Sequence, residues 1–114
     1  MVVNVEPAER IWRDEVFGPV VCIRPFDDEK QMLVEVNASP YGLSGSLWTN
    51  DLKRALRIAR QVESGVLSIN SHSSVHVEAP FGGFKNSGSG MFREMGKGAI
   101  EFFTKIKTIY MDGQ

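Results

Sequence analysis

One stretch organises this 114-residue chain: Ala79-Pro80-Phe81-Gly82-Gly83-Phe84-Lys85-Asn86-Ser87-Gly88-Ser89-Gly90. It is too rich in glycine for the interior of a helix or strand, because glycine loses more chain entropy there and has no side chain to pack. Two aromatic residues, Phe81 and Phe84, flank a glycine pair. We therefore predict a loop whose backbone runs close to another part of the molecule while its rings are held in place. It is not a phosphate-binding loop, since Arg93 stands where a dinucleotide fingerprint needs its third glycine.

Segments on both sides of this loop alternate between strand and helix patterns. Short runs rich in β-branched and apolar residues predict strands at 20–23, 43–48, 66–69 and 105–111. Between them, a helix is predicted after Asp27-Asp28 and another after Thr49 or Asn50, the residues expected to cap them. This order predicts an α/β fold with a largely parallel sheet flanked by helices.

The second of these helices has the clearest pattern, because its apolar residues recur every three or four positions; they are Leu52, Ala55, Leu56, Ala59 and Val62. A final helix is predicted from Phe92 to Phe103, with Met95 and Ala99 on the same face. Residues 70–90 lie between these elements and form too long a connection for a simple turn, and loops of that length tend to be functional.

Composition limits the function classes. Apolar residues make up 42% and charged residues 24% of the chain, as in an ordinary soluble domain, and the net charge is −1 with charges spread along the chain. We therefore expect neither a nucleic-acid partner nor a membrane partner, and no signal peptide is recognisable at the N-terminus. A single cysteine, Cys22, cannot form an internal disulfide, which favours a reducing, cytoplasmic setting.

Several short motifs follow one another along the chain: Asp14-Glu15-Val16-Phe17-Gly18-Pro19, Asn37 with Tyr41-Gly42-Leu43, Thr49-Asn50-Asp51, Gly65-Val66-Leu67-Ser68-Ile69-Asn70, Pro80-Phe81-Gly82-Gly83-Phe84-Lys85 with Ser87-Gly88, Arg93-Glu94-Met95-Gly96, and Phe103-Thr104 with Lys107-Thr108. Their order resembles the C-terminal part of the aldehyde dehydrogenase superfamily, the NAD(P)-dependent enzymes that oxidise aldehydes to acids. Each motif alone is weak, but the ordered set covers nearly the whole chain. One departure is that Met91-Phe92 separate the glycine-rich run from Arg93-Glu94, which family members usually join directly.

The resemblance implies roles for five residues. Glu15 matches the family's glutamate that accepts hydrogen bonds from the nicotinamide-ribose hydroxyls, a task that suits an acceptor-only carboxylate. Phe17 matches the aromatic residue beside the nicotinamide. Ser73, Val75 and Phe81 fall where the family's substrate tunnel is lined. The plain alternatives are a surface carboxylate for Glu15, core packing for Phe17 and a structural anchor of the loop for Phe81.

Two other features are poor candidates for chemistry. Cys22 lies in an apolar run that raises a thiol pKa and leaves it inert, and the family's catalytic cysteine belongs to a different motif, so a small buried apolar role is expected. His72 and His76 are four residues apart, which is metal-ligand spacing only on a helix, and the neighbouring serines favour a loop. We expect no metal site.

The resemblance also divides the chain. It implies that residues 1–103 form the C-terminal part of a catalytic domain and residues 104–114 a terminal strand used in oligomers. The nucleophile, the general base and most of the NAD or NADP site belong to family sequence N-terminal to this part, so the chain alone is expected to be inactive. Two alternatives remain: a non-catalytic interaction module that docks on full-length subunits through its terminal strand, and an unrelated α/β ligand-binding domain.

Overall fold

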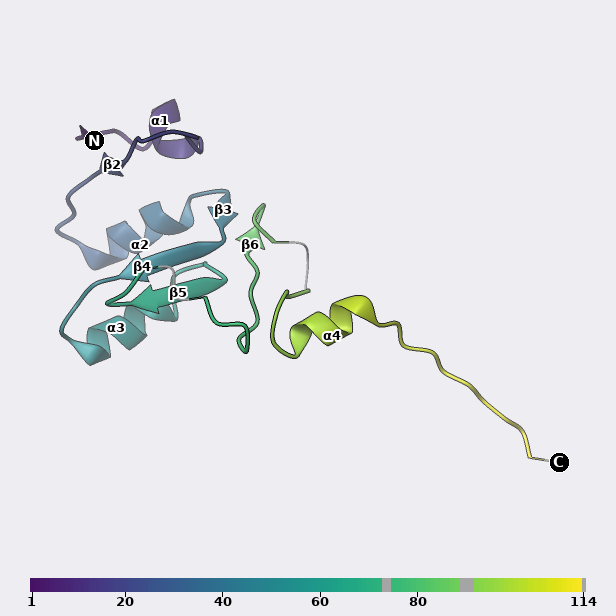
Figure 1. The fold of residues 1–114 in the computed structure, drawn as a ribbon. Coiled ribbons are helices and arrows are strands. Elements are labelled where there is room, and N and C mark those ends of the chain that lie inside the picture. The colour runs from purple at the N-terminus through teal and green to yellow at the C-terminus, as the bar shows by residue number, and fades with distance from the viewer. Residues whose placement is uncertain (73–74, 89–91, 114) are drawn as a thin grey trace.

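The computed structural model describes residues 1–72, 75–88 and 92–113. Helices and strands alternate along it (Figure 1). In chain order they are β1 (Val2–Val3), α1 (Arg10–Arg13), β2 (Cys22–Ile23), α2 (Glu29–Asn37), β3 (Tyr41–Gly42), β4 (Ser44–Leu47), α3 (Leu52–Ala59), β5 (Val66–Ile69), β6 (Phe84–Lys85) and α4 (Gly98–Phe103). The predicted strand at 66–69 is confirmed, and so are the two helices that precede it.

The strands form three separate pairs among the described residues. Strands β1 and β2 are parallel, β4 and β5 are parallel, and β3 and β6 are antiparallel. The β4–β5 pair is the longest and runs in register from Ser44 opposite Val66 to Leu47 opposite Ile69. The mixture of strands and helices agrees with the predicted α/β class, but one continuous, largely parallel sheet is absent from the described part of the chain.

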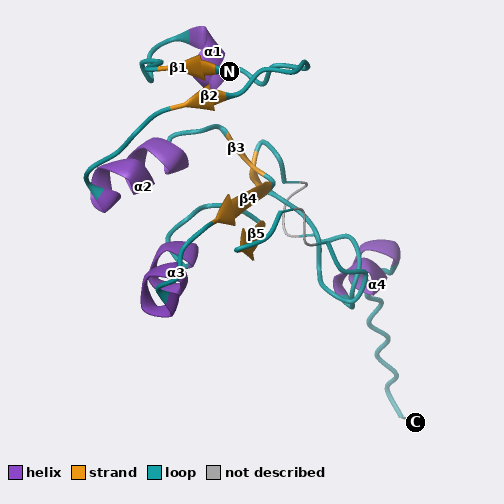
Figure 2. Ribbon diagram, turned by 60° about the vertical axis from the view of Figure 1, so that its left-hand side comes forward, coloured by secondary structure: helices purple, strands orange, loops and turns teal. Residues whose placement is uncertain are grey.

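Helices α2 and α3 lie beside the β4–β5 pair and supply most of the small core (Figures 1 and 2). Leu33 of α2 and Ala55 and Ile58 of α3 are buried. An aspartate caps the start of each helix: Asp28 accepts from the Lys30 backbone N–H at 2.8 Å and Asp51 from that of Arg54 at 3.1 Å. The expected cap of α3 at Thr49 or Asn50 is therefore wrong by one or two residues.

The glycine-rich loop packs against the chain before β5, as its composition predicts. A Cβ atom placed on Gly65 would collide with the backbone of Gly82 and Gly83, so the two segments approach as only glycine allows. Phe81 pairs with Glu94 through two backbone hydrogen bonds of 2.6 and 2.7 Å, and β6 pairs with β3. These contacts hold the loop at Phe81 and at β6.

The C-terminal part differs from the prediction in two ways. Helix α4 begins at Gly98 and not near Phe92, because Glu94 is bonded to Phe81 and the next two residues, Met95 and Gly96, have φ angles of 62° and 52°, which no right-handed helix allows. Residues 105–111 form no strand in this structure. They extend away from the body and are exposed, because no described segment lies beside them to pair with (Figure 1).

The molecule is elongated. Its radius of gyration is 18.9 Å, against about 13 Å for a compact domain of this length. In Figure 2, β1, α1 and β2 lie at one end and α4 with the C-terminal segment at the other. The run 20–23, predicted to be buried, is largely exposed at Val20, Val21 and Ile23. Among the described residues, no helix is both long and apolar enough to span a membrane.

Candidate functional site

Glu15 and Phe17 lie in the turn that joins α1 to β2. Tight backbone contacts shape this turn: the Gly18 N–H donates to the Val16 carbonyl at 3.0 Å and the Val20 N–H donates to the Gly18 carbonyl at 2.8 Å. Both candidate side chains are exposed, and Phe17 is 95% accessible. Core packing, the plain alternative for Phe17, is therefore wrong in this chain. A large aromatic ring left in solvent is available to contact another molecule or another part of a larger one.

Glu15 lines a cavity of about 470 Å³ together with residues from several other segments. Tyr41 and Gly42 come from β3, Glu63 from the chain before β5, and Ser87 from the glycine-rich stretch. Cavities of this size hold small ligands or parts of larger ones. The cavity thus gathers residues of three motifs that are far apart in the sequence.

Hydrogen bonds between the motifs build the wall of this cavity. The Gly42 N–H donates to Ser87 Oγ at 3.2 Å, and the Asn86 N–H donates to the Pro40 carbonyl at 3.0 Å. A Cβ atom on Gly42 would lie 3.2 Å from Cβ of Phe84 and would collide with the Glu63 carbonyl. The wall is therefore closely packed, and its shape depends on glycine at this position.

The two carboxylates that line the cavity differ in their surroundings. Glu63 is paired with Lys85, whose Nζ lies 2.7 Å from Glu63 Oε2. Glu15 makes no ion pair with any residue that the structure describes. Glu15 is therefore the carboxylate in this cavity that is free to accept hydrogen bonds from a ligand.

Of the predicted substrate residues, the two that the structure describes are not brought to this cavity. Phe81 is half-buried and held by its bridge to Glu94, which supports the structural alternative. Val75 is 48% exposed, and Ser73 lies outside the described residues. Neither Phe81 nor Val75 lines the cavity that contains Glu15.

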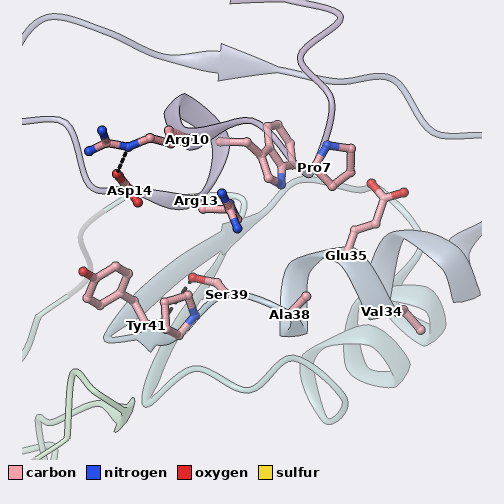
Figure 3. Close-up of a pocket in the computed structure, with 11 residues that line it drawn as sticks. Pro7, Arg10, Arg13, Asp14, Val34, Glu35, Ala38, Ser39 and Tyr41 are labelled. Carbon is pink, nitrogen blue, oxygen red and sulfur yellow. Dashed lines mark hydrogen bonds and ion pairs between the residues drawn. The ribbon is translucent and has the colours of Figure 1, made fainter.

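Sequence reasoning missed a second cavity, of about 560 Å³, between α1 and the segment that joins α2 to β3 (Figure 3). Arg10 and Asp14 form an ion pair of 3.0 Å on one side of it, and the side chain of Arg13 lies between α1 and Ser39. Ser39 and Tyr41 line both cavities. The charges of α1 are visible in the sequence, but nothing local indicates that they face the end of α2.

Sequence and structure comparisons identify the family. The sequence model of the aldehyde dehydrogenase family matches residues 1–109. The chain belongs to the aldehyde dehydrogenase family. Betaine aldehyde dehydrogenase 1 of Rhizobium meliloti is 46% identical over 108 residues, which are 95% of this chain and 22% of that enzyme. Phenylacetaldehyde dehydrogenase of Pseudomonas fluorescens is 47% identical over 100 residues, 88% of this chain and 20% of that enzyme.

Solved structures of the family agree with the fold. The NAD⁺ complex of a Bacillus cereus aldehyde dehydrogenase matches 98% of this chain and 22% of its own, with a TM-score of 0.89 and 33% identity. A Mycobacterium tuberculosis aldehyde dehydrogenase complexed with NAD⁺ matches 90% of this chain and 21% of its own, with a TM-score of 0.83 and 39% identity. The α/β class and the family resemblance are thus confirmed. The chain spans about a fifth of the length of these relatives.

Cys22, His72 and His76, the other reactive side chains considered from the sequence, do not line the Glu15 cavity of this family member. Cys22 is half-buried, so it is less enclosed than its apolar run predicts, and its thiol donates a weak hydrogen bond to the Ile11 carbonyl at 3.6 Å. His72 and His76 are exposed. No group of three or more His, Cys, Asp or Glu side chains that could hold a metal ion occurs among the described residues.

Proposed function

We propose that this chain is the C-terminal part of the catalytic domain of an aldehyde dehydrogenase that oxidises an aldehyde to a carboxylic acid with NAD or NADP. In this proposal Glu15 and Phe17 contact the nicotinamide end of the cofactor. Ser73, Val75 and Phe81 face the substrate tunnel. The observation that carries the proposal is the Glu15 carboxylate, which pairs with no described residue and lies in a cavity that the Tyr41-Gly42 and Ser87 motifs also line.

The residues present fit this cofactor. A carboxylate without an ion pair accepts two hydroxyl hydrogen bonds readily, which suits the diol of a ribose. The exposed ring of Phe17, two residues further on, offers an apolar face of the right kind for a nicotinamide ring. When bound, the cofactor would supply the hydride acceptor of the oxidation. The task of this chain's residues is to hold and orient it.

The remainder of the proposal concerns the complete enzyme. Residues 1–103 belong to the catalytic domain and residues 104–114 form an oligomerisation strand, so the assembled protein is a homo-oligomer. The nucleophilic thiol and the general base come from the rest of the enzyme. The NAD⁺ complexes of similar enzymes favour NAD over NADP, and the names of the relatives favour a small aldehyde. We place the protein in the cytoplasm, consistent with its single cysteine.

One observation favours a second candidate, a non-catalytic module that docks on full-length aldehyde dehydrogenase subunits. Residues 105–111 are exposed and unpaired in this structure, with Ile106 and Tyr110 almost fully accessible. A segment of that kind can add a strand to a neighbouring sheet. This candidate predicts binding to full-length subunits without any contribution of Glu15 to cofactor affinity.

The test uses a complete enzyme. This chain replaces the corresponding segment of the Bacillus cereus enzyme, whose structure matches 98% of this chain. The Glu15→Gln variant of the chimera is then compared with the parent chimera. We expect cofactor binding to weaken by about 1.5–3 kcal/mol, because Gln removes a charge-assisted acceptor while keeping its size. Cofactor titration and the rate of cofactor reduction measure this effect.

Glu9→Gln provides the control, since Glu9 is exposed and does not line the cavity of Glu15. Cofactor affinity and hydride-transfer rate equal to those of the parent would refute the role of Glu15. A parent chimera that folds but neither binds the cofactor nor oxidises any aldehyde of a broad panel would overturn the proposed function itself and leave the docking module as the better account.

A further inference from the structure

Lys85, at the end of β6, connects three parts of the chain through one ammonium group. Its Nζ donates to the Asn37 carbonyl at 2.5 Å and the Ser39 carbonyl at 3.0 Å, and it lies 2.7 Å from Glu63 Oε2. These contacts use all three donors of the ammonium. They also satisfy carbonyl groups at the C-terminus of α2, where the helix dipole favours a positive charge. The Lys85 side chain is 25% exposed, so these contacts are partly shielded from water.

The partners of Lys85 are fixed to one another as well. The Asn37 side chain donates to the Gln61 carbonyl at 2.8 Å and accepts from the Glu63 N–H at 2.9 Å. Lys85 itself has a φ of 51°, a left-handed conformation that a residue with a side chain keeps only when its surroundings favour it. Asn37, Ser39, Glu63 and Lys85 therefore form a connected junction.

This junction forms part of the wall of the Glu15 cavity. Ser39 and Glu63, two of the three residues that Lys85 contacts, line the cavity directly. Lys85 neutralises Glu63, which leaves Glu15 as the lining carboxylate that has no ion pair with a described residue. Loss of the ammonium would leave a second unpaired carboxylate there and would free the end of α2 to move.

We propose that Lys85 is a positioning residue for the cofactor half of the site. It fixes Ser39 and Glu63 in the cavity wall, and it limits the negative charge of that wall. The inference rests on the proposed function, in which Glu15 holds the nicotinamide ribose. It adds a residue that does not touch the cofactor but determines the shape and charge of the surface that does.

The test compares Lys85→Met and Lys85→Arg in the Bacillus cereus chimera, with Lys53→Met as the matched control. Lys53 is an exposed lysine of α3 that lies outside the cavity. We expect Lys85→Met to raise the cofactor KM about tenfold, because it removes a shielded charge partner. The aldehyde KM and kcat should change less than about threefold, since the interaction concerns cofactor binding. If Lys85 had a purely structural role, Lys85→Met would lower the melting temperature and would not change the cofactor KM more than the aldehyde KM.

Lys85→Arg keeps the charge but cannot reproduce three contacts of one ammonium atom, so its cofactor KM should rise about threefold. If Lys85→Met does not assemble, the cofactor KM of Lys85→Arg alone tests the positioning role of Lys85. Adding Glu63→Gln to Lys85→Met should recover part of the lost affinity, because it removes the uncompensated carboxylate. A cofactor KM in both Lys85 variants equal to that of Lys53→Met would overturn the inference.

The inference and the proposed function fail in different ways. If Glu15→Gln weakens cofactor binding while the Lys85 variants behave like Lys53→Met, the proposed function stands and the inference is wrong. If Glu15→Gln has no effect on cofactor binding, the role of Glu15 fails, and the inference that rests on it fails as well, whatever the Lys85 variants do.

Discussion

Glu29 illustrates how a single residue can serve two helices. It is the first residue of α2, where a negative charge is favoured by the helix dipole. Its carboxylate accepts from Arg57 of α3 at 2.6 Å and also from Arg54. The hydrogen bond from Arg57, together with that from Arg54, lowers the pKa of Glu29 below its ordinary value of 4.5, although partial burial acts in the opposite direction. The charged form of Glu29 is therefore the one that stabilises the fold.

We predict that Glu29→Gln destabilises the full chain at neutral pH and that this difference shrinks in acid. A depressed carboxylate pKa contributes stability that is fully present above the unfolded value of 4.5 and is lost as pH falls through the lower folded value. Urea unfolding of parent and variant, followed by tryptophan fluorescence at several pH values, measures this difference. Glu101→Gln, at an exposed position of α4, is the control. A difference that stays constant from neutral pH to about pH 3 would contradict the linkage.

At the scale of elements, α2 and α3 are started by local chemistry, whereas the start of α4 is set by contact with a distant segment. Asp28 and Asp51 cap α2 and α3, and both caps use residues next to the helix they start. In contrast, α4 starts later than predicted because Glu94 pairs with Phe81, which lies 13 positions earlier in the sequence. The pattern of apolar residues around Met95 favours a helix, and the bridge overrides it.

The cap of α3 can be tested directly. Asp51→Ala should destabilise the full chain by about 1 kcal/mol, because the Arg54 N–H loses its acceptor. Asn50→Ala, next to it, should have a much smaller effect, since the Asn50 side chain is not the cap. Urea unfolding gives both values. Equal losses of stability in the two variants would contradict Asp51 as the cap and would favour the cap expected from the sequence, at Thr49 or Asn50.

At the scale of the whole molecule, the structure exposes more apolar surface than a compact chain of this length. Phe17, Phe26, Trp48 and Phe103 are all more than half accessible, and the accessible fraction reaches 95% at Phe17 and 83% at Phe103. Residues 105–111 add an exposed segment that carries Ile106, Ile109, Tyr110 and Met111. Large apolar patches and unpaired extended segments drive association.

We predict that the purified 114-residue chain self-associates or binds a full-length relative, and that deletion of residues 105–114 reduces this association while the helices remain. Backbone groups of the exposed segment would otherwise stay unpaired. Analytical ultracentrifugation measures association and circular dichroism measures the helices. A clean monomer at about 10–50 micromolar, where partly exposed chains associate, would refute the prediction. An unchanged oligomer after the deletion would show that the contact is made by exposed apolar residues outside 105–114.

The sequence by itself determined the elements whose signals are local. The spacing of apolar residues predicted α3, the aspartates at 27–28 predicted the start of α2, and the β-branched run at 66–69 predicted β5. It also determined family membership, because the motifs and their order along the chain can be recognised without knowing how they are arranged in space. Glycine content alone indicated that the loop around Gly82 runs close to other backbone, which the contact with Gly65 bears out.

Only the tertiary structure decided which residues meet. Lys85 reaches the Asn37 carbonyl across 48 positions, and Gly42 reaches Ser87 across 45. Contacts over such separations depend on how helices and strands pack, and no short window of sequence records that packing. The same reason explains why the exposure of Phe17, the late start of α4 and the unpaired segment at 105–111 could not be predicted. Each depends on whether a distant part of the chain lies beside the residue, which the periodicity of its own neighbours does not determine.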